Sequence, residues 1–396
     1  MLRASHGLAL MVLALLVIGV VMVNSAGLSV DPDHPVTIQR IVLGSNVALA
    51  ALAMGMLLLG SCIPIDRLYT ARGGLSPVPW LVVAMIVALL AVHVPGLGRE
   101  VNGARRWIML GPMSFQPSEL VKWALPVVIA WYCCRRTGVL RSFRAGFVPP
   151  IALACLLCGL IAMEDLGTAA LIFVVCLVML VAAGCRLSHV ALLTAPALLA
   201  FAGLVASSDY RTKRVLAYLN PFDDPQGIGY HIIQSMTAVA GGGLAGRGLG
   251  NSIQKFAYLP EDTTDFIFAI VCEELGLVGA LMVISIYAAL LLCGLSIVKQ
   301  ARSGFARLLG LGILMTIGLQ AAINIAVVTG LAPTKGIALP LLSKGGTGWL
   351  LTAFAVGLLI SMDRTTNRLE APSDSTPEPV DAMDDLPDFQ ATPSLT

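Results

Sequence analysis

Long apolar runs separated by short polar segments extend along almost the whole chain. An apolar run of about 17–25 residues is long enough to cross a bilayer as a helix. The sequence contains ten such runs, near residues 7–23, 41–62, 79–95, 117–134, 147–163, 165–183, 187–206, 266–298, 305–329 and 337–361. The pattern therefore predicts an all-α polytopic membrane protein with about ten transmembrane helices.

Two polar interruptions divide the apolar pattern. The stretch 147–183 has the length of one long helix, but Glu164-Asp165-Leu166-Gly167 interrupts it, which predicts a tight turn between two helices. A much larger polar segment, residues 208–264, lies between the seventh and eighth helices. Long ordered loops tend to be functional, so we expect this large outer loop to contribute to a site.

The composition excludes a soluble globular protein. Hydrophobic residues make up 57% of the chain and charged residues only 12%, whereas a typical soluble domain has about 25% charged residues. The first apolar run is similar to the hydrophobic part of a signal peptide, but no small-residue cleavage site stands out and many more spans follow. Residues 1–368 are therefore assigned to one membrane domain.

The last segment, residues 369–396, differs from the rest of the chain. It is rich in proline, serine, threonine and acidic residues and has few apolar side chains. Such a segment cannot bury enough apolar surface to fold. We predict a disordered acidic tail.

The basic residues predict the orientation of the helices. An even number of spans places both termini on the same side of the membrane. The short loops on that side carry Arg67, Arg72, Arg135, Arg136, Arg141, Arg144, Arg186, Lys299, Arg302 and Arg307. Because short cytoplasmic loops carry an excess of lysine and arginine, both termini and the acidic tail are predicted to be cytoplasmic.

The opposite, outer side also carries basic residues, namely Arg99, Arg105, Arg106, Arg211, Lys213, Arg214, Arg247, Lys255 and Lys335. Several of them lie beside helix ends, against the charge rule. Two explanations remain open at this stage. These side chains bind an anionic ligand on the outer face, or they make ordinary contacts with lipid headgroups.

Acidic and basic residues at the outer ends of two helices are candidates for chemistry. Asp265 directly precedes the eighth apolar run, and an ionisable group at this depth is costly and marks a functional site by default. Lys122 lies about one turn inside the fourth helix, which Pro117 and Glu119 indicate as a helix start. The lysine is expected either to extend outward to the interface or to pair with an acid.

Two further groups have a structural interpretation. Glu273 and Glu274 lie about 12 Å further down the eighth helix at a rise of 1.5 Å per residue, where we expect contacts between helices that fix packing. The glycines at 246 and 248 are only superficially similar to a phosphate-binding loop, because no strand precedes them. A closely packed glycine hinge is the favoured interpretation.

Longer motifs carry a resemblance to a known family. They are Asn102-Gly103-Ala104-Arg105-Arg106-Trp107, Gln116-Pro117-Ser118-Glu119 with Lys122, Asp165-Leu166-Gly167-Thr168, Asn220-Pro221, Tyr258-Leu259-Pro260-Glu261 with Thr264-Asp265-Phe266, and Pro333-Thr334-Lys335-Gly336. From the first to the tenth predicted helix, the chain resembles the SEDS family of shape, elongation, division and sporulation proteins (FtsW, RodA and SpoVE). The Pro-Thr-Lys-Gly form is more like the FtsW branch. Thr263, Met163-Glu164 and Lys344 depart from the family pattern.

The resemblance implies a peptidoglycan glycosyltransferase that joins lipid II units on the outer face of the cytoplasmic membrane, in cell division or cell elongation. It also implies a class B penicillin-binding protein and other divisome proteins as partners, and no nucleic acid. Asp265 matches the essential aspartate of the family, and Trp107 and Lys122 match two further residues required for activity. The other candidates for substrate binding are Arg105, Arg106, Glu119, Arg247, Lys255 and Glu261.

Glycosyl transfer from a lipid pyrophosphate needs a base for the acceptor hydroxyl and positive charge for the departing pyrophosphate. Asp265 is the expected base, and Lys122 with Arg105 or Arg106 is expected to bind the pyrophosphate. A divalent cation, Mg or Mn, could bridge Asp265 to phosphate, although no dedicated cluster of metal ligands stands out.

Two alternative functions remain open. A lipid II flippase or transporter would place polar residues through the full depth of the bundle. A non-catalytic division scaffold would need no site at all.

Overall fold

The computed structural model describes residues 3–27, 44–70, 76–101, 104–110, 113–254, 263–344 and 346–370. Within these ranges, ten helices occupy the predicted spans: α1 (Ala4–Ala26), α3 (Ser45–Cys62), α5 (Pro77–Ala91), α6 (Pro117–Arg135), α7 (Val148–Glu164), α8 (Leu166–Ala182), α9 (Leu187–Ala206), α12 (Ile267–Gln300), α13 (Gly304–Val328) and α14 (Gly346–Glu370). Among the described residues, seven helices are long and apolar enough to cross a membrane, and α5 and α8 are apolar but shorter. The predicted fold class, a polytopic α-helical membrane protein, is confirmed.

The predicted start of the tenth helix is wrong. The apolar pattern places it at residue 337, whereas α14 begins at Gly346. Pro340 lacks the N–H that a helix interior requires. The carbonyls of Ile337 and Ala338 accept hydrogen bonds from α13 side chains instead of helical N–H groups. The apolar residues before Gly346 therefore form a loop that lies at one end of the bundle.

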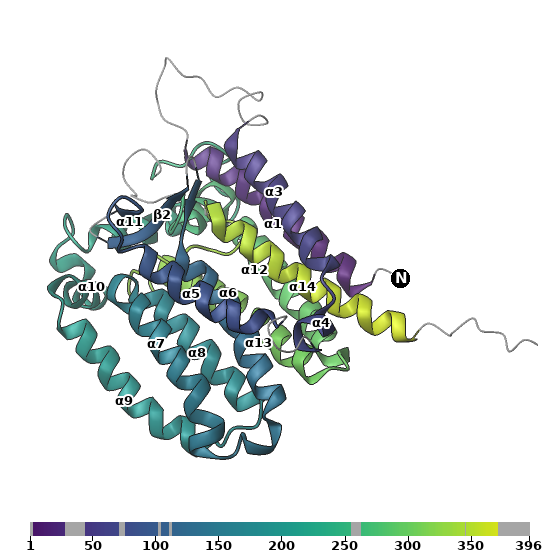
Figure 1. Ribbon diagram of the computed structural model, residues 1–396. Coiled ribbons are helices and arrows are strands. Elements are labelled where there is room, and N and C mark those ends of the chain that lie inside the picture. Colours follow the sequence, from purple (N-terminus) through teal and green to yellow (C-terminus); the bar gives the residue numbers. More distant parts are fainter. Residues whose placement is uncertain are drawn as a thin grey trace, which may run out of the picture.

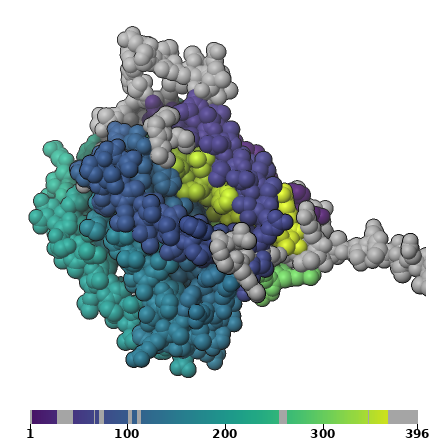
Figure 2. All heavy atoms as spheres, viewed as in Figure 1, coloured from purple at the N-terminus to yellow at the C-terminus, as the bar shows by residue number. Residues whose placement is uncertain are grey.

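The helices form two unequal groups (Figure 1). On one side α14 packs along α3, and glycines permit the close approach: a Cβ added to Gly60 would lie 2.4 Å from the carbonyl oxygen of Phe354. Figure 2 shows α14 at the bottom of a hollow between α3 and α5. On the other side α9 stands at the edge of the bundle, and no residue of this helix is buried. An apolar helix without buried residues is suited to face lipid.

Helix α12 (Ile267–Gln300) is broken near its N-terminal end. Gly276 has φ 67° and ψ −162°, a conformation that glycine tolerates and other residues avoid. The segment from Gly243 to Gly248 supplies hydrogen-bond partners for the backbone groups at this break. The N–H groups of Arg247 and Gly248 donate to the carbonyls of Glu273 and Glu274, and the N–H of Leu277 donates to the carbonyl of Gly243. The backbone groups freed by the break are thus satisfied inside the protein, as a membrane span requires.

Small elements cover one end of the bundle, where α10, α11 and β2 lie together (Figure 1). Three short antiparallel strands precede α6, in the order β1 (Gly98–Val101), β2 (Ala104–Leu110) and β3 (Met113–Phe115). The outer loop between α9 and α12 contains α10 (Asp209–Leu219), η4 (Pro221–Asp223) and α11 (Tyr230–Gly241). The remaining short elements are α4 (Ile65–Thr70), η2 (Thr137–Val139) and η3 (Phe143–Phe147). We did not predict the sheet, because strands of three to seven residues leave little alternation to recognise.

Candidate functional site

A cleft of about 780 Å³ lies at this end of the bundle, within the usual size range of small-molecule sites. Residues from β2, α6, α8, α10, α13 and the loop before α14 line it. Five of the nine predicted site residues are among them: Arg106, Trp107, Glu119, Lys122 and Asp265. Segments that are far apart in the sequence therefore bring most of the candidate residues to one place.

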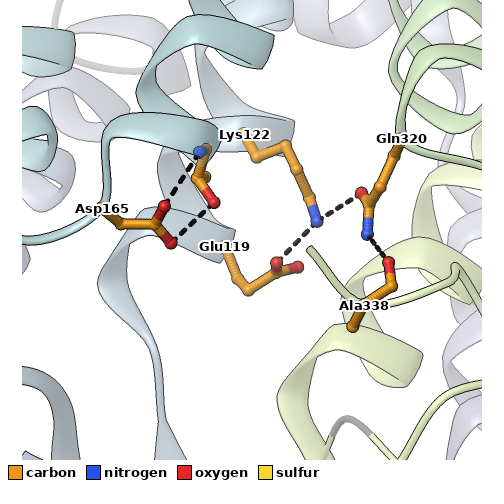
Figure 3. Close-up of polar contacts among 6 residues, drawn as sticks. Glu119, Lys122, Asp165, Gln320 and Ala338 are labelled. Carbon is orange, nitrogen blue, oxygen red and sulfur yellow. Dashed lines mark hydrogen bonds and ion pairs between the residues drawn. The ribbon is translucent and has the colours of Figure 1, made fainter. Parts of the chain in front are cut away.

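Lys122 is almost fully buried, with 3% of its side chain exposed, and it does not extend outward to the interface. Its Nζ lies 2.6 Å from Oε1 of Glu119, one turn earlier in α6, and donates to Oε1 of Gln320 at 2.9 Å (Figure 3). Of the two expectations for this lysine, pairing with an acid is the one that the structure shows. Its positive charge is largely balanced inside the protein.

Two polar residues of α13 hold the cleft together. Gln320 donates from Nε2 to the carbonyl of Ala338 at 2.7 Å (Figure 3). Asn324 donates from Nδ2 to the carbonyls of Asp265 at 2.8 Å and Ile337 at 2.7 Å. Helix α13 thus fixes both the loop before α14 and the backbone of Asp265. We did not name this pair among the candidate site residues, although polar residues four positions apart share a helix face and stand out in an apolar span.

Asp265 lies just before α12 and faces the loop before α14. An added Cβ on Gly336 would be 2.9 Å from Oδ2 of Asp265. The carboxylate therefore occupies space that only a glycine at position 336 leaves open.

Asp165 lies at the predicted turn between α7 and α8. It caps α8 by accepting from the backbone N–H of Thr168 at 3.0 Å and from its hydroxyl at 2.9 Å (Figure 3). An Asp at this position satisfies N–H groups that a helix start leaves without partners. The predicted turn is confirmed, and its cap forms part of the cleft wall.

Lys335 lines the cleft next to this cap. Burial lowers the pKa of Lys335 from 10.5. The charge of Asp165 acts in the opposite direction, and the charges of Arg211 and Arg214 lower the pKa further. Sequence reasoning placed these three basic residues on the outer side but not in the site.

The other predicted site residues lie elsewhere. Arg105 forms an exposed ion pair with Glu100 at 3.4 Å. Arg247 does not line the cleft. One of its guanidinium nitrogens lies 3.6 Å from Glu273, and Nε donates to the carbonyl of Gly241. Lys255 and Glu261 are outside the described residues.

Glu273 and Glu274 are buried and make packing contacts, as expected from the sequence. Glu273 accepts from the hydroxyl of Ser252 and from the backbone N–H of Ile253 at 3.0 Å. Glu274 accepts from the hydroxyl of Ser25 in α1 at 2.7 Å and 2.8 Å. Both carboxylates connect other segments to α12.

The donor set gives little support to a dedicated metal site. Within the described part of the chain, no three His, Cys, Asp or Glu side chains gather closely enough to hold a metal ion. Asp265 is a carboxylate of the cleft that lies against the loop before α14, at Gly336.

Comparisons with known proteins place the chain in a family. The model of the family described as "Cell cycle protein", which groups FtsW, RodA and SpoVE, matches residues 6–368. Stage V sporulation protein E of Bacillus subtilis strain 168 is 44% identical over 285 residues, covering 72% of this chain and 78% of that protein. The probable peptidoglycan glycosyltransferase FtsW of Alkalilimnicola ehrlichii is 40% identical over 373 residues, covering 91% and 89%.

The fold has a solved counterpart. A chain from a peptidoglycan synthase complex, in a structure concerned with the coordination of polymerization and crosslinking, matches with a TM-score of 0.71. It is 28% identical, and the match covers 91% of this chain and 97% of that chain. The protein is thus a multi-pass membrane protein of the bacterial cell-wall machinery by fold. The chain belongs to the FtsW, RodA and SpoVE family.

Proposed function

We propose that this protein is a peptidoglycan glycosyltransferase that polymerises lipid II on the outer face of the cytoplasmic membrane, and that it acts in cell division. The single observation that carries the proposal is the position of Asp265. Its carboxylate lies in a cleft with basic side chains at one end of a membrane bundle. The relative named FtsW, together with the Pro333-Thr334-Lys335-Gly336 form, supports the assignment to division over elongation.

Asp265 is the proposed general base. Its carboxylate takes the proton from the acceptor sugar hydroxyl, and the freed oxygen attacks the anomeric carbon of the donor sugar. The bond from that carbon to the lipid pyrophosphate breaks, and the pyrophosphate leaves with the bonding electrons. Basic side chains in the cleft stabilise the negative charge that develops on the leaving group.

The orientation follows from the substrate. Lipid II presents its sugars on the outer face, so the cleft must open there and both termini must be cytoplasmic. The arginines at the opposite end of the bundle support this arrangement. A class B penicillin-binding protein is the proposed partner, since the related solved chain comes from a complex that couples polymerization to crosslinking.

A divalent cation, Mg²⁺ or Mn²⁺, would be held by Asp265 together with phosphate oxygens of the substrate. When bound, it would neutralise charge on the pyrophosphate. Loss of polymerisation on chelation, restored by either ion, would support its participation.

The transporter alternative is less well supported. It needs polar groups through the depth of the bundle, but Glu273 and Glu274, the acidic residues of α12, are engaged in packing contacts. A scaffold would have no use for a large polar cleft.

The test is polymerisation of lipid II by the purified protein with its penicillin-binding partner, comparing wild type with Asp265→Asn. This change keeps the volume and removes the base, so we expect the polymer to be lost while the protein remains folded. Polymer formed at nearly the wild-type rate would contradict the base assignment. Lipid II translocation by vesicles containing the protein, with no polymer from the wild type, would favour the transporter.

A further inference from the structure

Basic side chains outnumber acids in the cleft. The described residues that line it include the basic side chains Arg106, Lys122, Arg211, Arg214, Lys335 and Lys344, and the carboxylates Glu119, Glu164, Asp165 and Asp265. A lipid pyrophosphate needs positive charge that no protein carboxylate already neutralises. The question is therefore which of these basic groups have such partners.

Lys122 does not meet this requirement. It is buried, its Nζ lies 2.6 Å from Glu119, and Gln320 takes a further hydrogen bond. A phosphate at Lys122 would have to replace these contacts and approach the carboxylate of Glu119. In contrast, no ion pair within 4.0 Å joins Arg211, Arg214 or Lys335 to a carboxylate in the part of the chain that the structure describes.

Neutral groups hold these three side chains in place. Arg211 donates to the carbonyls of Ala162 and Met163 at 3.1 Å and 3.2 Å, in the last turn of α7, and to the carbonyl of Leu204 at 3.1 Å. Carbonyls at a helix end lack intrahelical partners and attract a cation. The guanidinium is therefore fixed in position and keeps its net charge.

Arg214 and Lys335 are held in a similar way. Arg214 donates to the carbonyl of Thr334 at 3.4 Å, and its guanidinium lies 4.5 Å from the ring centre of Tyr210. The Nζ of Lys335 lies 5.1 Å from the ring centre of Phe201. A ring face attracts a cation without neutralising it. The charge of Asp165 also acts on Lys335, but the two side chains form no ion pair within 4.0 Å.

These basic groups lie beside the proposed base. Lys335 immediately precedes Gly336, against which the Asp265 carboxylate packs. The stem of Lys335 passes over Gly167, where an added Cβ would lie 3.3 Å from its Cδ. One short segment thus presents a cation on one side and adjoins the carboxylate on the other. A donor sugar between the two would have its pyrophosphate near Lys335 and its anomeric carbon within reach of an acceptor activated by Asp265.

We propose that Arg211, Arg214 and Lys335 form the subsite that binds the lipid-linked pyrophosphate, and that Lys122 is a positioning residue held by Glu119 and Gln320. This inference rests on the proposed function, because it names the part of the same cleft that holds the substrate's leaving group. It reverses the assignment of pyrophosphate binding to Lys122 made from the sequence.

The test measures binding without catalysis. The full-length protein in phosphatidylcholine nanodiscs is titrated with undecaprenyl pyrophosphate, and Kd is compared for wild type, Arg211→Gln, Arg214→Gln and Lys335→Met. Loss of a charge-assisted hydrogen bond corresponds to a Kd increase of about tenfold per substitution. Lys213→Gln is the matched control. Lys213 lies in α10 together with Arg211 and Arg214, but it is exposed and does not line the cleft. This variant should leave Kd unchanged.

The double variant Lys122→Met with Glu119→Gln removes both partners of the buried pair, and its Kd should change by less than about threefold. If Lys122 bound the pyrophosphate directly, the same double variant would instead lose about tenfold in affinity. Lys335→Arg keeps the positive charge and should bind more tightly than Lys335→Met. If its melting temperature is unchanged, the loss in Lys335→Met is due to the missing charge and not to misfolding. Unchanged Kd in the three single variants, or a tenfold loss in the Lys122 and Glu119 double variant, would overturn the proposal.

The phosphate of a phospholipid headgroup is the other ligand that these three basic side chains could bind. Displacement of undecaprenyl pyrophosphate by an equal concentration of phosphatidylglycerol would assign the cluster to membrane phospholipid and overturn the proposal. The two proposals fail separately. If the wild-type protein binds undecaprenyl pyrophosphate but makes no polymer, the proposed function is contradicted and the proposed subsite is not. If the wild-type protein makes polymer but the variants keep the wild-type Kd, only the proposed subsite is contradicted.

Discussion

The carboxylate of Asp265 packs directly against the backbone of Gly336, so that a methyl group on Gly336 would lie 2.9 Å from Oδ2. Asn324 joins the same two segments through hydrogen bonds to the carbonyls of Asp265 and Ile337. A residue without a side chain and one amide of α13 thus both contact the segment that carries the proposed base.

We predict that Gly336→Ala reduces polymerisation at least tenfold, because the added methyl group displaces the Asp265 carboxylate from its position. Reaction geometry is sensitive to shifts of about 1 Å. The measurement is the rate of lipid II polymerisation together with the melting temperature of the purified protein. Gly159→Ala is the control, since an added Cβ there meets no atom within 4 Å. Full activity of Gly336→Ala would show that the Asp265 carboxylate can move without loss of polymerisation rate.

For the buried pair, we predict that Lys122→Met alone destabilises the protein more than Lys122→Met combined with Glu119→Gln. Removing one partner leaves the other charge buried, which costs about 3–5 kcal/mol, whereas replacing both restores a neutral site. Thermal unfolding in detergent measures the difference. A double variant less stable than the single variant would mean that Glu119 has another cationic partner.

The sequence was sufficient for the helices but not for their ends. Ten apolar runs predicted ten helices, because crossing a bilayer requires length and hydrophobicity that are read locally. The start of α14 was misplaced because residues 337–344 continue the apolar pattern of the helix. Their conformation depends on hydrogen bonds from Gln320 and Asn324, which come from a different helix. Such bonds between segments leave no local pattern.

Residues of the cleft could be predicted where charge stood out against an apolar background, as at Asp265 and Lys122. They could not be predicted where function depends on which groups neutralise one another. Arg247 and Lys335 look alike in the sequence, yet Arg247 lies 3.6 Å from Glu273 and Lys335 faces the cleft. Only the folded arrangement distinguishes a paired cation from one that can bind a ligand.

Glu273 anchors the outer loop to α12, so we predict that Glu273→Leu speeds amide exchange at Ile253 and lowers the melting temperature. The substitution removes the acceptor for the Ser252 hydroxyl and the Ile253 N–H, each worth about 1 kcal/mol. Ser252→Ala should have a smaller effect, because the Ile253 bond remains. Equal effects of the two variants, measured by hydrogen exchange, would show that the carboxylate contributes nothing beyond the serine contact.

The lowered pKa of Lys335 gives a pH dependence. A lysine is charged below its pKa, and burial together with Arg211 and Arg214 brings this pKa below 10.5, with Asp165 opposing the shift. Affinity for undecaprenyl pyrophosphate should therefore fall as the pH rises through that lowered pKa. Lys335→Arg keeps its charge at these pH values, so its Kd should stay level between pH 7 and pH 10. If Kd depends on pH in the same way in the wild type and in Lys335→Arg, Lys335 is not the titrating group.

The final prediction concerns topology, on which the mechanism depends. The cleft with Asp265 and the loop between α9 and α12 must face outward, and the arginine-rich segment after α6 must face the cytoplasm. Gln226 and Ser142 are exposed positions in these two regions, whereas Ser252 is buried against Glu273 and unsuitable as a probe. Gln226→Cys and Ser142→Cys are introduced singly into a background without native cysteines.

A membrane-impermeant thiol reagent applied to intact cells, after the outer membrane is made permeable where one is present, should label the Gln226→Cys protein. The Ser142→Cys protein should be labelled only after lysis. The reasoning is that arginines concentrate in the short loop after α6, that an even number of helices returns the chain to the same side, and that the substrate carries its sugars outward. Labelling of Ser142→Cys but not of Gln226→Cys in intact cells would place Asp265 on the cytoplasmic side. Lipid II sugars would then be out of its reach, and the catalytic assignment would fail with the orientation.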